Sequence, residues 1–224
     1  MKKMKKEKIY IVEDDVMIVQ LLTNHLGKNY QVASVQNFRA VSQEVVEFQP
    51  DLVLMDISLP YYNGFYWTTE IRKSMTMPII FISSSDDEMN AVMAMNMGGD
   101  DFVAKPFSLT ILDAKIAAFL RRVNQFSKTA DLQLDQFKLS PDGRFSDGKS
   151  SIQLSPTETK ILTPLMQQVG QIVSKEVLLE SLWENEEFID QNTLNVNMTR
   201  LRKKVSEVGF DRIHTVRGVG YLVK

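Results

Sequence analysis

Leu52-Val53-Leu54-Met55-Asp56 places four apolar residues directly before one carboxylate. An apolar run of this length, followed by the turn signal Leu59-Pro60, is typical of a strand buried on both faces of a parallel sheet. Open α/β sheets bind ligands at the carboxyl ends of their strands. The pattern therefore predicts that Asp56 lies at the edge of a sheet, where chemistry can reach it.

Other polar residues follow strand patterns in the same way. Glu13-Asp14-Asp15 comes after an apolar run at 9–12, Ser83 ends a run at 78–83, and Lys105-Pro106-Phe107 comes after a run at 101–103. The carboxyl ends of parallel strands share one edge of the sheet. We therefore expect acids, a hydroxyl and a lysine to gather around Asp56.

About the first 120 residues alternate between strand and helix patterns. This alternation predicts a parallel sheet with helices on both faces, and five strands predict a flavodoxin-like α/β fold. The expected strands are 8–12, 31–35, 52–56, 78–83 and 101–103, and the expected helices are 16–29, 37–48, 65–74, 88–97 and 108–124.

The chain changes character after a polar segment. We predict a first domain over 1–123, a linker over 124–130 and a second domain over 131–224. Short alternating runs between 132 and 154 predict a small antiparallel sheet. Ser155-Pro156-Thr157-Glu158 predicts a capped helix start, and further helices are expected at 174–183 and 191–208, before a hairpin at 213–223. Three helices followed by a hairpin form a winged-helix (α+β) pattern.

Composition limits the function classes. The 224 residues suffice for two domains, and 44% hydrophobic with 24% charged residues is ordinary for a globular protein. Without cysteine there is no disulfide, cysteine-ligated zinc or thiol nucleophile. A net charge of −2 predicts neither nucleic-acid nor membrane binding. The basic start lacks a secretory apolar segment, and no run is long enough to span a membrane, so a cytoplasmic protein is expected.

The polar residues around Asp56 predict phosphoryl chemistry. Clustered carboxylates need a cation, and hard oxygen ligands favour Mg²⁺. Lys105 and Ser83 would add an ammonium and a hydroxyl, which suit the oxygens of a phosphoryl group. Asp56 would then be the nucleophile that forms an aspartyl phosphate. Each residue alone would equally suit a helix cap or a solvated turn, and only their joint placement favours a site.

Residues 8–122 resemble the receiver domain of bacterial two-component response regulators. The resemblance is carried by Glu13-Asp14-Asp15, Asp56 with Leu59-Pro60 and Gly64, Ser83, Gly98 with Asp100-Asp101-Phe102, and Lys105-Pro106-Phe107. Gly64-Phe65-Tyr66-Trp67 also resembles the subgroup of regulators tied to cell-envelope stress and peptide-antibiotic transporters.

The resemblance implies that a sensor histidine kinase phosphorylates Asp56. It implies that Asp14, Asp56 and the Ser58 carbonyl ligate Mg²⁺, with Glu13 acting through water. Ser83 and Phe102 would form the switch pair, although Phe102 stands where a tyrosine is commoner.

The expected helix at 191–208 has an apolar face formed by Leu194, Met198, Leu201, Val205 and Val208. Donors and cations on the other faces suit the major groove, although a solvated amphipathic helix is the alternative. Over 125–224 there are 13 basic and 13 acidic residues, but basic residues concentrate in 199–217 and form a basic edge. The polar face and its flanks carry Asn192, Thr193, Asn195, Val196, Thr199, Arg200, Arg202, Lys203 and Lys204.

The last hairpin predicts a wing. In Thr215-Val216-Arg217-Gly218-Val219-Gly220-Tyr221 the glycines permit a tight turn, whose tip would present Arg217 to a narrow minor groove. With Leu182-Trp183 and Asn192-Thr193-Leu194, this block resembles the effector domain of the OmpR/PhoB family over about 129–224. The resemblance implies double-stranded DNA as a partner.

The resemblance also implies roles for single residues. Arg200 would contact bases, Arg202 and Lys203 phosphates, and Arg217 the minor groove. Residues 184–190 align with a loop that touches RNA polymerase in this family, or they form a solvated loop. The predicted DNA-contacting set is Asn192, Val196, Thr199, Arg200, Arg202, Lys203, Thr215 and Arg217.

In this family, phosphorylated receivers form a homodimer through the fourth helix, the fifth strand and the fifth helix. Pairing raises the effective concentration of two effector domains on repeated DNA half-sites. Ala91 and Ile111 stand where a charged pair is common, so we expect a less ionic interface with Asp101–Arg122 as its bridge. The predicted interface residues are Asp100, Asp101, Ile111, Lys115 and Arg122.

Three hypotheses remain. The first is a phosphorylation-switched transcription factor, and the second keeps DNA binding under the control of protein partners without phosphorylation. The third is a phosphohydrolase. Haloacid-dehalogenase-type enzymes place an acid two residues after the nucleophile, whereas this chain has Ser58 there. We therefore expect no enzyme.

Overall fold

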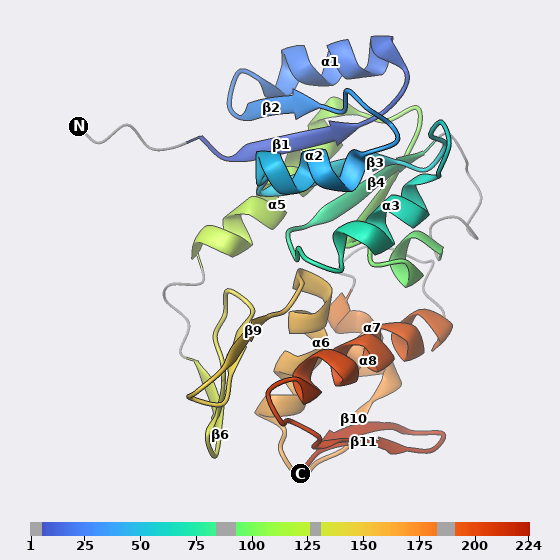
Figure 1. Ribbon diagram of the computed structural model, residues 1–224. Coiled ribbons are helices and arrows are strands. Elements are labelled where there is room, and N and C mark those ends of the chain that lie inside the picture. The colour runs from blue at the N-terminus through green and yellow to red at the C-terminus, as the bar shows by residue number, and fades with distance from the viewer. Residues whose placement is uncertain (1–5, 84–92, 126–130, 183–190) are drawn as a thin grey trace. The chain divides into compact units, whose positions relative to one another are not determined.

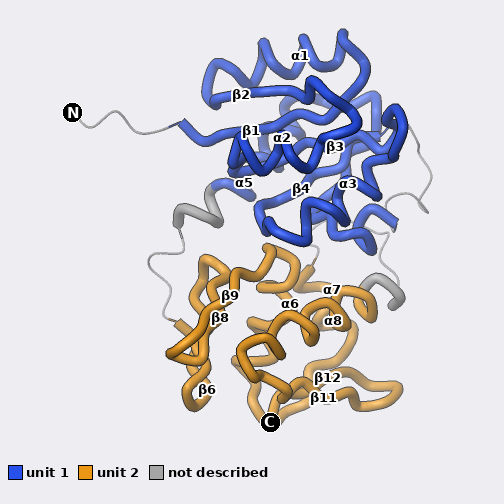
Figure 2. The backbone as a smooth tube through the Cα atoms, viewed as in Figure 1, with its two compact units in different colours: residues 1–121 blue, residues 122–224 orange. Residues whose placement is uncertain are grey.

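The computed structural model describes residues 6–83, 93–125, 131–182 and 191–224 and divides the chain into two compact units, 1–121 and 122–224 (Figure 2). Helix α5 (Leu109–Gln125) continues into the first two residues of the predicted linker, because polar residues can extend a helix. The rest of that linker, 126–130, lies outside the described residues. The predicted domain bounds therefore stay predictions.

Unit 1 is built on a parallel sheet with the strand order β2-β1-β3-β4-β5. This order and the strand–helix alternation confirm the flavodoxin-like prediction. Of the predicted helix at 88–97, residues 93–96 are helical and 88–92 lie outside the described residues. The elements are β1 (Lys8–Val12), α1 (Val16–Leu26), β2 (Gln31–Ser34), α2 (Val41–Phe48), β3 (Leu52–Asp56), α3 (Gly64–Ile71), β4 (Ile79–Ser83), β5 (Asp101–Ala104) and α5.

The central strand β3 is buried over its whole length. Its residues alternate between two cores: Val53 and Met55 pack with side chains of α2 and α3, and Leu52 and Leu54 pack with those of α1 and α5. Figure 1 shows α2 and α3 in front of this sheet. Helices cover both faces of β3, so its first four residues are apolar. Its one polar side chain, Asp56, lies at the carboxyl end of the strand.

Unit 2 confirms the predicted winged-helix domain. A four-stranded antiparallel sheet, β6-β7-β8-β9, precedes three helices and a three-stranded sheet, β10-β12-β11 (Figure 1). All five residues of the apolar face predicted for the helix at 191–208 are buried, although α8 ends at Ser206 and Val208 follows it. The elements are β6 (Leu132–Leu134), β7 (Phe137–Leu139), β8 (Arg144–Ser146), β9 (Ser151–Gln153), α6 (Pro156–Gln167), β10 (Val173–Ser174), α7 (Lys175–Leu182), α8 (Gln191–Ser206), β11 (Ile213–Val216) and β12 (Gly220–Val223).

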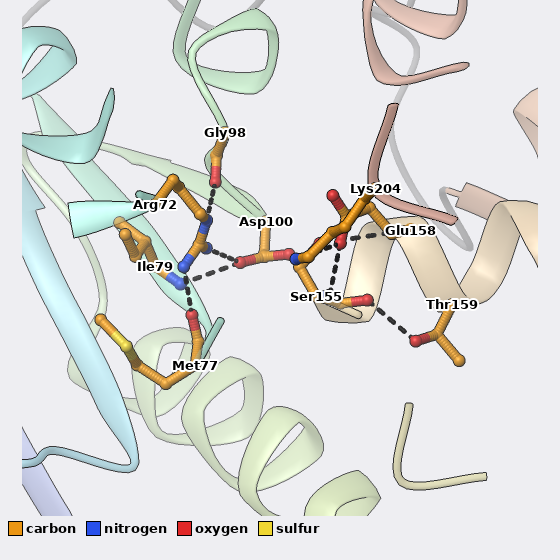
Figure 3. A network of polar contacts seen from close by, with 9 residues as sticks. All are labelled: Arg72, Met77, Ile79, Gly98, Asp100, Ser155, Glu158, Thr159 and Lys204. Atoms are coloured by element: carbon orange, nitrogen blue, oxygen red, sulfur yellow. Dashed lines mark hydrogen bonds and ion pairs between the residues drawn. The ribbon is translucent and has the colours of Figure 1, made fainter. Parts of the chain in front are cut away.

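The first turn of α6 is capped by its own side chains and is hydrogen-bonded to α8. The Ser155 side chain accepts from the Glu158 N–H, and the Glu158 carboxylate accepts from the Ser155 N–H at 2.7 Å, which is the predicted capping box. Lys204 of α8 donates to the same Glu158 carboxylate at 3.0 Å (Figure 3). Lys204, expected beside the DNA-contacting face, therefore pairs with an acid inside its own domain.

Candidate functional site

Three carboxylates meet at the carboxyl edge of the sheet in unit 1. Glu13 follows β1, Asp56 ends β3, and each is only 4% exposed, whereas Asp14 is exposed. One oxygen from each of Glu13, Asp14 and Asp56 lies within 4.8 Å of the other two. β1 and β3 are neighbours, and the chain crosses from one side of β1 to the other between β2 and β3, which is where such sheets bind ligands.

Lys105 lies among these acids. Its Nζ donates to Glu13 Oε2 at 2.7 Å and to Asp56 Oδ2 at 3.1 Å. The Lys105–Pro106 peptide bond is cis, and the Lys105 N–H donates to the Ser83 carbonyl at 2.6 Å. The predicted convergence of Lys105 on Asp56 is thus present.

Burial and charge oppose each other in this cluster. Burial raises the pKa of the Glu13 carboxyl, and the hydrogen bond from Lys105 offsets only part of that shift. Burial alone would lower the pKa of Lys105, but its hydrogen bond to Glu13 and the charges of Asp56 and Glu13 raise that pKa by more. Three carboxylates face one ammonium, so the donor set suits a hard divalent cation such as Mg²⁺.

Asp15 caps a helix, unlike its two acidic neighbours, Glu13 and Asp14. It is the N-cap of α1, and its Oδ1 accepts from the N–H groups of Met17 at 2.8 Å and Ile18 at 3.3 Å. An N-cap carboxylate satisfies donors that a helix start leaves unpaired. Glu13 and Asp14 therefore remain for the cluster, as predicted.

The start of α3, which follows the loop after Asp56, packs closely against the backbone of Asp56. Asn63 caps α3 by accepting from the Tyr66 N–H, and Gly64 donates to the Ile57 carbonyl. A Cβ at Gly64 would lie 2.0 Å from the Asp56 carbonyl oxygen. The sequence placed Gly64 in the family motif but gave no sign of this contact, because it depends on how α3 packs against β3.

The remaining predicted receiver residues, Ser83, Ser58 and Phe102, differ in burial and in their distance from Asp56 in the fold. Ser83 is buried at the end of β4, one residue beyond the partner of Asp56 in the strand register. Ser58 is exposed, and its N–H lies 3.4 Å from Asp56 Oδ1. Phe102 is half-buried and packs beside the core that contains α2 and α3. Their switch and ligand roles stay predictions.

Three of the predicted dimer residues, Asp100, Asp101 and Lys115, form ion pairs within the receiver. Asp100 Oδ2 accepts from Arg72 Nη2 at 2.6 Å and from the Ile79 N–H at 3.0 Å (Figure 3). Lys115 Nζ donates to both Asp101 oxygens, at 2.9 and 3.1 Å. Ile111 is 56% exposed. The Arg122 side chain and Ala91 lie outside the described residues, so the Asp101–Arg122 bridge stays a prediction.

The predicted DNA face of α8 is largely at the surface. Thr199 and Lys203 are exposed, and Val196 and Arg200 are half-buried. Thr215 and Arg217 are exposed on the hairpin, and Gly218 forms its turn with a φ of +75°. Gly220 serves another purpose, because a Cβ there would lie 2.1 Å from the Val173 carbonyl of β10. The side chain of Asn192 and residues 184–190 lie outside the described residues.

The fold and this acidic edge with its lysine define a receiver joined to a winged-helix domain. Residues 9–117 match the family described as response regulator receiver domain, and residues 148–223 match transcriptional regulatory protein, C terminal. None of the helices in the described parts of the chain combines the length and apolar character that a membrane-spanning segment needs.

Full-length relatives agree with both matches. YvcP of Bacillus subtilis (strain 168), named an uncharacterized transcriptional regulatory protein, is 41% identical, covering 96% of this chain and 94% of YvcP. The response regulator protein GraR of Staphylococcus haemolyticus (strain JCSC1435) is 41% identical, covering 96% of this chain and 98% of GraR.

A solved structure agrees for the receiver. It is the N-terminal domain of the nisin resistance regulator NsrR, described as a lantibiotic response regulator. It is 68% identical over 52% of this chain and 100% of that chain, with a TM-score of 0.50. The chain belongs to the two-component response regulators of the OmpR/PhoB family, which are transcriptional regulators with a receiver and a DNA-binding domain.

Proposed function

We propose that a sensor histidine kinase phosphorylates Asp56 and that this phosphorylation switches DNA binding by the winged helix. The contact of Lys105 Nζ with both Glu13 and Asp56, at the end of two neighbouring strands, carries the proposal. One ammonium among three carboxylates is arranged for an added anion and cation rather than for fold stability alone.

The proposed phosphoryl transfer from the kinase to Asp56 uses Asp56, Lys105, Ser83 and a bound Mg²⁺. An Asp56 carboxylate oxygen attacks the phosphorus of a phosphohistidine, the P–N bond breaks, and its electron pair stays on the departing imidazole. Lys105 would give up its bond to Asp56 Oδ2 and donate to a phosphoryl oxygen. Mg²⁺, held by Glu13, Asp14 and Asp56 with the Ser58 carbonyl, would neutralise charge on the phosphoryl group. Ser83 would donate its hydroxyl to the same group, with Phe102 moving behind it.

The surface beside Asp56 suits a kinase. Val16 is 65% and Met17 79% exposed in the first turn of α1, and Leu21 is also exposed one turn further on. Apolar residues gathered at one helix surface commonly mark a binding site. They adjoin Asp14 and Asp15 in sequence, so a helical partner seated there would bring its histidine toward the acidic cluster.

On the DNA side, Thr199, Arg200 and Lys203 would enter the major groove from α8, with Val196 and Asn192 beside them. Arg217 at the hairpin tip would reach the minor groove, and Thr215 would lie next to the backbone. Arg202 already donates two hydrogen bonds to the hairpin, so its proposed role is to hold the hairpin, and the phosphate contact that the family resemblance implies is the alternative.

Phosphorylation would pair two receivers and load two winged helices onto repeated half-sites. Ile111, Asp101 and Arg122 would contribute to that pairing, and Lys115 would share the Asp101 carboxylate with Arg122 of the second copy. We leave Asp100 out of it, because Arg72 and the Ile79 N–H hold that side chain inside the receiver. RNA polymerase is the proposed further partner, and a cytoplasmic location follows from the proposed DNA binding.

The subgroup is also a proposal. The Gly64-Phe65-Tyr66-Trp67 motif and the 68% identity to the receiver of a nisin resistance regulator support a response to peptides that damage the cell envelope. The alternative function is the same DNA binding controlled by partner proteins without phosphorylation. Ser58, in the place of an acid, speaks against a phosphohydrolase.

Intact mass after incubation with acetyl phosphate and Mg²⁺ tests the proposal. We expect a gain of about 80 Da in the wild type, none in Asp56→Asn, and the full gain in Asp15→Asn. Affinity for DNA should rise with the modification. A wild type that gains no mass but binds DNA specifically would support the alternative.

A further inference from the structure

One row of α8 side chains includes a residue that the sequence placed only at a flank. Asn195, Thr199 and Lys203 are all exposed and recur every four residues. Side chains at this spacing lie one above another on a helix. Asn195 therefore shares a surface with Thr199 and Lys203, two of the proposed DNA contacts.

The amide of Asn195 is held by a residue of the wing. The hydroxyl of Tyr221, which is only 4% exposed on β12, donates to Asn195 Oδ1 at 2.8 Å. A buried hydroxyl requires a partner, and here the partner is an exposed side chain rather than a core group. Within the described residues, no group accepts a hydrogen bond from Asn195 Nδ2, the donor on the other branch of the same planar amide.

Arg202 fixes the strand pair that carries Tyr221. Its Nε donates to the Ile213 carbonyl at 3.1 Å, its Nη2 donates to Thr215 Oγ1 at 2.8 Å, and its guanidinium lies 5.4 Å from the centre of the Tyr221 ring. Thr215 and Tyr221 are opposite each other in the β11–β12 register. α8 and the wing are thus joined by a cluster made of Asn195, Arg202, Thr215 and Tyr221.

We propose that Asn195 contacts DNA as a hydrogen-bond donor and that Tyr221 and Arg202 are positioning residues that hold its amide; this rests on the proposed DNA binding. The partner of Asn195 Nδ2 would be an acceptor, either a base edge such as guanine O6 or thymine O4, or a phosphate oxygen. Because Tyr221 occupies Oδ1, a single donated bond is favoured over the paired contact that asparagine makes with adenine.

A double-mutant cycle in the full-length protein tests the proposal. The probe is a DNA duplex selected from a random pool by the wild type, and the variants are Asn195→Ala, Tyr221→Phe and the double variant. Tyr221→Phe keeps the ring against Arg202 and removes only the hydroxyl. Each single variant should lower affinity about fivefold, and the double variant should bind no more weakly than Asn195→Ala, because Tyr221 acts through Asn195.

Repeating the selection with each variant separates the two kinds of acceptor. A base contact predicts that the same single position of the site loses its preference in Asn195→Ala and Tyr221→Phe. A phosphate contact predicts weaker binding with an unchanged sequence preference.

The proposal would be overturned by Asn195→Ala binding within about twofold of the wild type. It would equally be overturned by losses that add in the double variant, which indicate a purely structural role for the Tyr221 hydroxyl. If the wild type selected no sequence at all, the proposed DNA-binding function itself would fail, and this inference with it.

Discussion

The first residue of α3, Gly64, lies so close to Asp56 that an added Cβ would be 2.0 Å from the Asp56 carbonyl oxygen and 3.0 Å from Met55 Cγ. Real Cβ atoms do not approach backbone this closely, so any side chain at position 64 must displace the end of β3 or the start of α3. The position of Asp56 therefore depends on a glycine eight residues later.

Gly64→Ala should lower the free energy of unfolding by roughly 1–3 kcal/mol, as overpacking does, and should slow phosphorylation by acetyl phosphate because the Asp56 backbone shifts. Urea unfolding and intact mass measure the two effects. Gly148→Ala is the control: its φ of +86° makes the change strained by about 1–2 kcal/mol, but nothing lies within 4 Å. Normal phosphorylation of Gly64→Ala would refute the link to Asp56.

Mg²⁺ should raise the unfolding temperature of the wild type, since a ligand that binds only the folded state stabilises it by about 2.7 kcal/mol at 100 times its dissociation constant. Asp14→Asn should lose this response. Asp15→Asn should keep it, because Asp15 serves α1 and asparagine caps a helix equally well. A response that survives in Asp14→Asn would remove Asp14 from the proposed ligands.

Glu13→Gln should stabilise the metal-free protein in a pH-dependent way. Because burial raises the pKa of Glu13 above its ordinary value of 4.5, the folded state binds that proton more tightly than the unfolded chain. The wild type then loses stability as the pH rises from 4.5 toward the raised pKa, whereas the glutamine variant has no such loss.

Urea unfolding in chelator between pH 4 and pH 8 measures this. The advantage of Glu13→Gln should grow with pH and be smallest at pH 4. Glu70→Gln, which removes a surface pair with Lys73, should give no growing advantage. An advantage of Glu13→Gln that shrinks with rising pH would mean that Lys105, rather than burial, sets the pKa of Glu13.

The sequence predicted what depends on local pattern. β3 could be found because it is apolar on both faces, and the site followed because Glu13, Asp56 and Lys105 each lie at the carboxyl end of a strand of one parallel sheet. The face of α8 that packs in the core was visible in its spacing.

What the sequence missed depends on residues distant in the chain. Gly220 looked like a turn glycine, but it lets β12 pass the Val173 carbonyl. Lys204 was expected beside the DNA-contacting face, but it pairs with Glu158, 46 residues earlier. Neither partner can be recognised until strand register and helix packing are known, because nothing near either residue marks the contact.

The dimer proposal requires Asp101 to serve two cations. Lys115 holds both Asp101 oxygens within the receiver, so Arg122 of a second copy must share that carboxylate. With beryllofluoride as the phosphoryl mimic, Arg122→Glu should weaken dimerisation up to about fivefold, the limit for an exposed pair, and Lys115→Gln should leave it equal or stronger. Sedimentation equilibrium measures both, with Lys73→Glu as the surface control. Unchanged pairing of Arg122→Glu would exclude the bridge.

Arg202 and Lys203 are neighbours on α8 with different expected roles, and salt can distinguish them. Each phosphate neutralised adds about 0.9 to the slope of log affinity against log salt. Lys203→Gln should reduce that slope by about this amount and weaken all sequences alike. Arg202→Gln should weaken binding with little change in slope, because it loosens the hairpin that carries Arg217. Lys149→Gln, in the β8–β9 turn, should change neither. Equal slope losses for both variants of α8 would instead make Arg202 a phosphate contact, as the family resemblance implied.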